Sequence, residues 1–156
     1  HLFVSPAAGL DVVTRLSEAS WAAVTSQFLS DEQWSAKMLS PAARGLSESE
    51  LRGHVIAGFN FPPSQFQLHL QYMLPPFLPF HLGMLRAGRH YTKGRFFPLG
   101  YVREALEALV GLTTKNSPAG IPDAPSLNVV ELTGRIRDLT GIDYDVIHAR
   151  ETARFE

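Results

Sequence analysis

The clearest pattern of hydrophobic and polar positions lies in residues 64–72, where the two kinds of side chain alternate strictly from Gln65 onward. Apolar side chains occupy every second position from Phe66 to Tyr72. The positions between them carry Gln67, His69 and Gln71. Because side chains change face at every residue of a strand, this pattern predicts a strand over 66–74. One face would pack on a core, and the other would display hydrogen-bonding groups around an imidazole.

A second apolar run, residues 54–61, predicts a strand directly before this one. Pro62 and Pro63 lie between the two runs, and they cannot continue a strand because proline has no ladder N–H. The two runs therefore predict an antiparallel hairpin.

Helical periodicity governs most of the remaining chain. Apolar residues recur at helical spacing after the Ser5-Pro6 start signal and predict a helix that ends near Leu29. Further helices are predicted over 30–38, over 100–112, and over 127–139 with Ser126 as its cap and Gly141 after its end. We expect a short strand over 2–4, a loop or short helical turn over 40–49, an extended segment over 74–81, a strand or loop over 90–99, and a loop over 115–126.

These elements together predict an α+β fold, an antiparallel sheet with helices packed against it. We expect one domain over residues 1–112, followed by a loop, a C-terminal helix and a weakly specified tail over 113–156.

Composition narrows the classes of function. The chain has 156 residues, a net charge of −1 and no cysteine, so thiolate chemistry is excluded and a zinc site is not expected. The charge lacks the basic excess of proteins that bind long nucleic acids. No apolar run is long enough to cross a membrane and no secretory signal is visible, so we expect the cytoplasm or another intracellular compartment. We expect no cofactor.

The polar face of the predicted strand is the one part of the sequence that suggests chemistry. A neutral imidazole such as His69 can attack phosphorus, while carboxamides at Gln67 and Gln71 can donate to phosphate oxygens. The simpler interpretation is a solvent-facing side of an antiparallel sheet, which needs no function. Neutral hydrogen-bonding groups in place of the usual charged ones favour the first interpretation.

The same residues resemble the motif of the histidine-triad superfamily, in which three polar positions alternate with apolar ones. Residues 67–73 match this frame, with the central histidine at His69 and glutamine in the first and third places. Ser64 stands five residues before that histidine, as it commonly does in the family. Glutamine in the third place is typical of the transferase branch, which includes diadenosine tetraphosphate phosphorylase and galactose-1-phosphate uridylyltransferase. A second likeness is to the scavenger mRNA-decapping enzyme, through Pro63-Ser64.

The resemblance covers about residues 1–112 and is strong over 53–80. It implies a nucleotidyl transferase or hydrolase that acts on a nucleotide or nucleotide sugar through a nucleotidyl-histidine intermediate. The catalytic residues that it implies are His69, Gln71 and Gln67, and the substrate-binding residues that it implies are Ser64, Gln65 and Asn60.

The chain also departs from the family pattern. Gln67 occupies a place that usually holds histidine, and residues 60–63 replace the family's glycine-rich loop. The strands that precede the first helix in the family are missing here, so a longer parent chain, or a partner chain in a homodimer or other assembly, would supply them. The alternative function is therefore a catalytically degenerate domain of this family that serves as a binding or assembly subunit.

Overall fold

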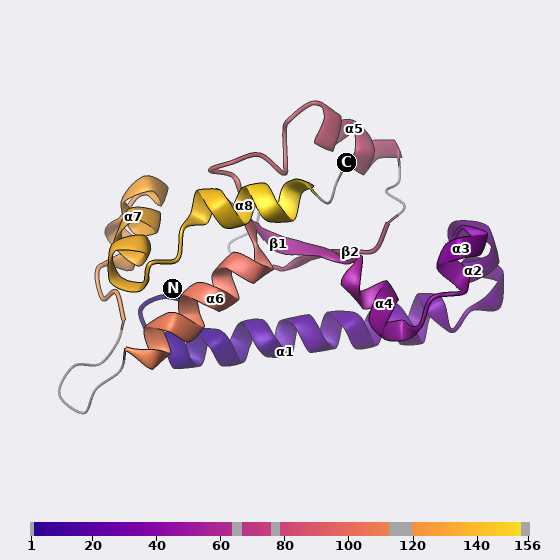
Figure 1. Cartoon of the computed structure of the whole chain (residues 1–156), viewed down its shortest axis with the longest axis horizontal. Helices are drawn as coiled ribbons and strands as arrows, with labels where there is room; N and C mark the ends of the chain where they lie inside the picture. The colour runs from indigo at the N-terminus through magenta and orange to yellow at the C-terminus, as the bar shows by residue number, and fades with distance from the viewer. Residues whose placement is uncertain (1, 64–66, 76–78, 113–119, 154–156) are drawn as a thin grey trace.

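The computed structural model describes residues 2–63, 67–75, 79–112 and 120–153. The fold is α+β, with a small antiparallel sheet among helices (Figure 1). The helical elements are α1 (Pro6–Val24), the π-helical turn η1 (Thr25–Leu29), α2 (Glu32–Met38), α3 (Pro41–Arg44), α4 (Glu48–Gly53), α5 (Pro79–Arg86), α6 (Leu99–Gly111), the 3₁₀ turn η2 (Ala124–Ser126), α7 (Val129–Thr140) and α8 (Tyr144–Thr152). The strands are β1 (Ile56–Asn60), β2 (Gln71–Met73) and β3 (Phe96–Pro98).

The sheet has the order β2-β1-β3, and β1 pairs antiparallel with both neighbours. The β1–β2 pairing places Gly58 opposite Gln71, which confirms the predicted hairpin. Strand β2 is much shorter than the predicted 66–74. Continued in the same register, the ladder would set Pro62 and Pro63 opposite residues 67 and 66, and neither proline has an N–H to donate.

Helices α1 and α6 pack against each other and cover the inner face of the sheet, with α1 along the bottom of Figure 1. Phe59 of β1, Phe97 of β3 and Leu70, just before β2, contribute to this inner core. Its most deeply buried side chains come from α1, α6, α7 and the 120–126 segment, and they are Val13, Tyr101, Ala105, Leu106, Leu109, Ile121, Ala124 and Ile136.

The outer face of the sheet carries a smaller core of Ile56, Tyr91 and Phe96, on which Met73 and Leu85 pack. The ring of Phe96 lies directly over Gly58. A Cβ on Gly58 would come within 2.5 Å of that ring and 2.6 Å of the Phe97 carbonyl oxygen. Glycine at this position is therefore a packing requirement.

The C-terminal helix α8 is tied to the sheet by Tyr144. Its hydroxyl donates to the carbonyl of Phe96 at 2.9 Å and accepts from the N–H of Gly94 at 2.8 Å. Its ring stacks on Phe97, with centroids 4.9 Å apart, and meets Tyr101 edge-on. The C-terminal helix therefore packs into the same hydrophobic core as the elements before residue 112.

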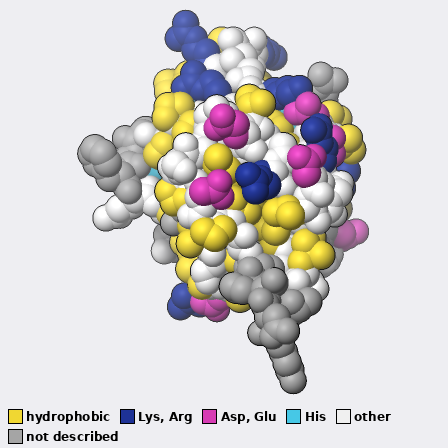
Figure 2. Space-filling model, turned by 90° about the vertical axis from the view of Figure 1, so that its left-hand side faces the viewer, with side chains coloured by type: hydrophobic (Ala, Val, Ile, Leu, Met, Phe, Trp, Pro, Cys, Tyr) yellow, Lys and Arg dark blue, Asp and Glu magenta, His cyan; other side chains and the backbone are white. Residues whose placement is uncertain are grey.

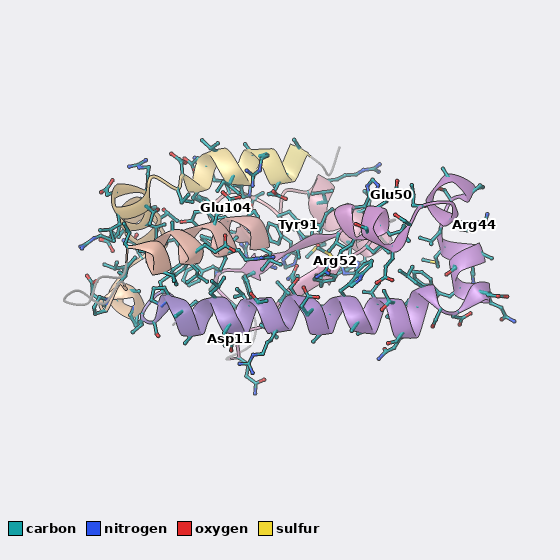
Figure 3. All side chains as sticks on the ribbon, turned by 60° about the horizontal axis from the view of Figure 1, so that its bottom comes forward. Asp11, Arg44, Glu50, Arg52, Tyr91 and Glu104 are labelled. Atoms are coloured by element: carbon teal, nitrogen blue, oxygen red, sulfur yellow. The ribbon has the colours of Figure 1, made fainter. Side chains whose placement is uncertain are left out.

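The short helix α4 is held to α1 by three contacts, two made by Arg52 and one by Glu48. The guanidinium pairs with Glu18 at 2.6 Å and lies 5.7 Å from the ring centroid of Trp21. The indole N–H of Trp21 donates to Glu48 at 2.8 Å. Figure 3 shows Arg52 beside α1, on the side that faces the sheet. By contrast, α2 and α3 lie at one end of the molecule, away from the sheet (Figure 1).

Several predicted elements need correction. Residues 2–4 form turns, so the predicted short strand there is wrong. The segment 74–81 was expected to be extended, but α5 begins at Pro79, because a proline in a first helical turn gives up no intrahelical hydrogen bond. The cap of α7 is Asn128 in place of Ser126, in a capping box with Glu131.

Other predictions are confirmed. The long first helix ends at Leu29 as predicted, with a π-helical last turn. Helix α6 matches the predicted 100–112 helix within one residue at each end, and Gly141 ends α7 with a positive φ of 76°. Residues 90–99, predicted as a strand or a loop, form turns followed by β3. Within the described ranges, no helix is both long and apolar enough to span a bilayer.

The contact between Phe96 and Gly58 gives a direct stability prediction. We expect Gly58→Ala to lower the free energy of unfolding by about 1–3 kcal/mol, since the methyl group overpacks a buried ring and a backbone carbonyl. The matched control is Gly134→Ala in α7, where a Cβ meets nothing within 4 Å. That change should raise stability by roughly 0.5–1 kcal/mol through helix propensity. Urea denaturation of both variants tests the pair, and equal effects would contradict the packing argument.

Buried His148 in α8 predicts a pH dependence of stability. Burial lowers the pKa of His148, while the backbone of Tyr91 and Thr92 and the charge of Asp145 oppose that shift and Lys93 reinforces it. Its Nε2 is buried without a hydrogen-bond partner in the described structure. A depressed folded-state pKa means that the neutral form is favoured by folding. The contribution of neutral His148 to the free energy of unfolding is therefore fully present above a pH of about 6.5, the pKa of histidine in the unfolded chain. It is lost as the pH falls below that value.

We expect the free energy of unfolding to fall between pH 7.5 and pH 5.5, and the fall to be smaller in His148→Gln. His54→Gln, which changes an exposed histidine, should retain the whole pH dependence. Urea denaturation at the two pH values measures this fall in the free energy of unfolding. If the fall is just as large in His148→Gln, this residue is not its cause.

Candidate functional site

A cavity of about 310 Å³ opens where the sheet ends near Asn60 and is closed on the far side by α7. Its walls are mostly apolar side chains from the N-terminal segment, β1, β3, α6 and α7, including Phe3, Phe59, Phe97, Leu132 and Ile136. Its polar members include Asn60, Gln67 and His69, three of the six residues predicted as site residues. The size suits a small organic ligand.

His69 lies on the wall of this cavity, just before β2 begins. Its Nδ1 is 3.2 Å from the carbonyl oxygen of Gln67. A carbonyl oxygen can only accept, so this contact favours the tautomer with the proton on Nδ1. The lone pair is then on Nε2, which is the state of an imidazole that can act as a nucleophile.

Two buried polar atoms on the cavity wall have no hydrogen-bond partner within the described part of the chain. They are Oδ1 of Asn60 and the hydroxyl of Tyr101. Burial also raises the pKa of Tyr101 well above its usual value, so its hydroxyl stays neutral. Unpaired buried polar atoms are costly, and a ligand with polar groups could satisfy them.

The structure does not bring Gln71 into this cavity. Gln71 is the first residue of β2 and lies opposite Gly58. It lines a separate pocket of about 360 Å³ with Met73, His81 and His90. The expected row of Gln67, His69 and Gln71 is thus divided between two pockets, because the regular strand starts only at Gln71.

The predicted alternation holds only in part. Leu70 packs on the inner core and Tyr72 lies beside Ser17 and Arg52, which agrees with an inward apolar face. Leu68 is 47% exposed, contrary to the prediction of a core position. The predicted substrate-binding residues Ser64 and Gln65 lie outside the described residues.

The cavity near His69 lacks the charge expected of a phosphate site. Among the described residues that line it, none is lysine or arginine. Figure 2 shows the end of the molecule that carries α7, where basic and acidic side chains are interspersed among apolar ones. No group of three or more histidine, cysteine, aspartate or glutamate side chains that could hold a metal ion occurs in the described ranges.

Residues that sequence reasoning missed make up much of the cavity wall. Leu132, Thr133 and Ile136 of α7 close it, and the sequence had predicted only that this segment is helical. Helical periodicity identifies a core-facing stripe but does not tell which other elements the stripe will meet.

Comparison with known proteins adds no independent assignment. No protein-family model, no curated protein and no solved structure matches this chain.

Proposed function

We propose that this chain is a nucleotidyl transferase or hydrolase of the histidine-triad type, with His69 as its nucleophile. The observation that carries the proposal is the contact between His69 Nδ1 and the Gln67 carbonyl, at the wall of a cavity of ligand size. The likeness of residues 64–73 to the family motif supports it. The apolar walls would receive the base, and the polar end near Asn60 and Gln67 would receive the phosphoryl group.

In the first step, Nε2 of His69 attacks the α-phosphorus of the nucleotide. A P–N bond forms, the bond from phosphorus to the leaving oxygen breaks, and the leaving group departs with the electron pair. The ring then carries a positive charge, and its Nδ1–H remains against the Gln67 carbonyl, which stabilises that charge. In the second step, an oxygen of water or of a phosphate acceptor bonds to phosphorus as the P–N bond breaks. The electron pair of that bond returns to Nε2, which restores the neutral imidazole, and any proton on the attacking oxygen passes to solvent.

The covalent intermediate can be tested by intact-mass spectrometry. After incubation with a panel of nucleoside triphosphates, dinucleoside polyphosphates and nucleotide sugars, we expect a mass gain of one nucleoside monophosphate. The gain should be acid-labile, absent in His69→Ala and retained in His54→Ala. If no substrate in the panel yields an adduct, or if His69→Ala still yields it, this mechanism is wrong.

A second candidate function is a catalytically degenerate domain of the same type that serves as a binding or assembly subunit. The separation of Gln71 from His69 favours it, as does the lack of a basic side chain among the described residues of the cavity. Nucleotide binding by calorimetry without an adduct, or a stable homo-oligomer in native mass spectrometry with no turnover, would support this candidate over the first.

A further inference from the structure

The pocket on the outer face of the sheet, like the cavity near His69, has no lysine or arginine among the described residues that line it, but it holds two histidines where the cavity holds one. It lies between β2 and the segment that runs from α5 to residue 91. Its polar members include Gln71, His81 and His90, and none of the described residues that line it is a carboxylate. Its apolar floor is formed by Met73 and Tyr91, whose hydroxyl donates to the Met73 sulfur at 3.0 Å. Figure 3 places Tyr91 near the centre of the molecule.

Helix α5 carries His81 to this pocket. His81 and Leu85 are four residues apart, so they lie on the same face of the helix. Leu85 packs on the outer core with Ile56 and Phe96, which turns that face of α5 toward the sheet. The position of His81 at the pocket therefore follows from how α5 is anchored.

His90 is oriented by Asn60, at the end of β1. The Nδ2 of Asn60 is 3.2 Å from Nδ1 of His90. An amide nitrogen can only donate, so Nδ1 accepts and the neutral ring keeps its proton on Nε2. His90 can thus offer an N–H donor to a ligand, and Gln71 can offer a carboxamide N–H beside it.

The stretch of sequence that supplies the pocket residues is free of acidic side chains. From Leu51 to Arg103 the sequence contains no aspartate or glutamate, while the same stretch carries Arg52, Arg86, Arg89, Lys93, Arg95 and Arg103. Lys93 pairs with Asp145 and Arg52 with Glu18, so acids from outside the stretch offset part of this charge. Arg86 and Arg89, near the end of α5, have exposed side chains.

We propose that the outer pocket is a phosphate-binding site in which His81, His90 and Gln71 donate to the phosphate oxygens. Imidazole and carboxamide N–H groups suit an oxyanion, and the acid-free stretch around them adds no repelling carboxylate. Asn60 acts as a positioning residue for His90. The site stands independently of the chemistry proposed for His69.

The test measures binding of inorganic phosphate, pyrophosphate and AMP by calorimetry, together with the ring signals of the histidines by NMR. We expect the signals of His81 and His90 to move on addition of ligand and those of His54 to stay. His90→Gln should weaken binding about tenfold or more, the usual loss for a hydrogen bond to a charged group. His81→Gln should weaken it as well, and His54→Gln is the matched control.

The ligand that binds shows whether the site takes a free phosphate anion or the phosphate of a nucleotide. Binding of inorganic phosphate or pyrophosphate that depends on His90 indicates a free anion. Binding of AMP alone, with the same dependence, indicates the phosphate of a nucleotide. If no ligand moves the His81 and His90 signals, or if His54→Gln weakens binding as much as His90→Gln, the proposal is overturned.

The His69→Ala protein separates this proposal from that of the nucleotidyl-histidine intermediate. It cannot form the adduct, yet it should bind pyrophosphate through His90 as the unmodified chain does. Loss of pyrophosphate binding in His69→Ala would overturn the outer site, whereas absence of an adduct alone would leave that site standing.

Discussion

The closeness of Phe96 to Gly58 is the constraint on which the outer half of this structure depends. The central strand β1 can accept an aromatic ring across its face only where it has no side chain. The ring in turn supports Tyr91 and Ile56, and Met73 and Leu85 complete the layer. This small core holds α5 and the turn before β3 against the sheet. The positions of both histidines of the outer pocket therefore depend on glycine at position 58.

Sequence patterns predicted those parts of the fold whose stability comes from local periodicity. The helix after Pro6, helix α6 and the hairpin of β1 and β2 follow from apolar spacing, and their caps or breakers are local too. Helices α5 and α8 were missed, because a proline-rich start and a mixed polar face hide them. Tyr144 ties α8 to the sheet through hydrogen bonds with Gly94 and Phe96. These two residues lie about fifty positions away in the sequence, so no local pattern reveals the contacts.

The candidate site was predictable as a set of residue types but not as an arrangement. The structure places three of the residues that the motif selected, His69, Gln67 and Asn60, on the wall of one cavity. It placed Gln71 with them on the assumption of an unbroken strand, and the prolines at 62 and 63 remove the pairing partners that such a strand would need. The aliphatic wall from α7 depends on how the C-terminal residues fold back, which the motif does not encode.

Asn60 contributes to two ligand spaces at once, and this has an energetic consequence. Its side chain lines the cavity of His69, while its amide nitrogen holds His90 at the outer pocket. A ligand in the cavity that drew this nitrogen away from His90 would release the ring, whereas one that accepted from its second N–H or donated to the unpartnered Oδ1 would leave the contact intact. Occupancy of either space would then alter affinity at the other by the same factor, because thermodynamic coupling between two sites is reciprocal. The carboxamide of Asn60 would then couple the two spaces directly.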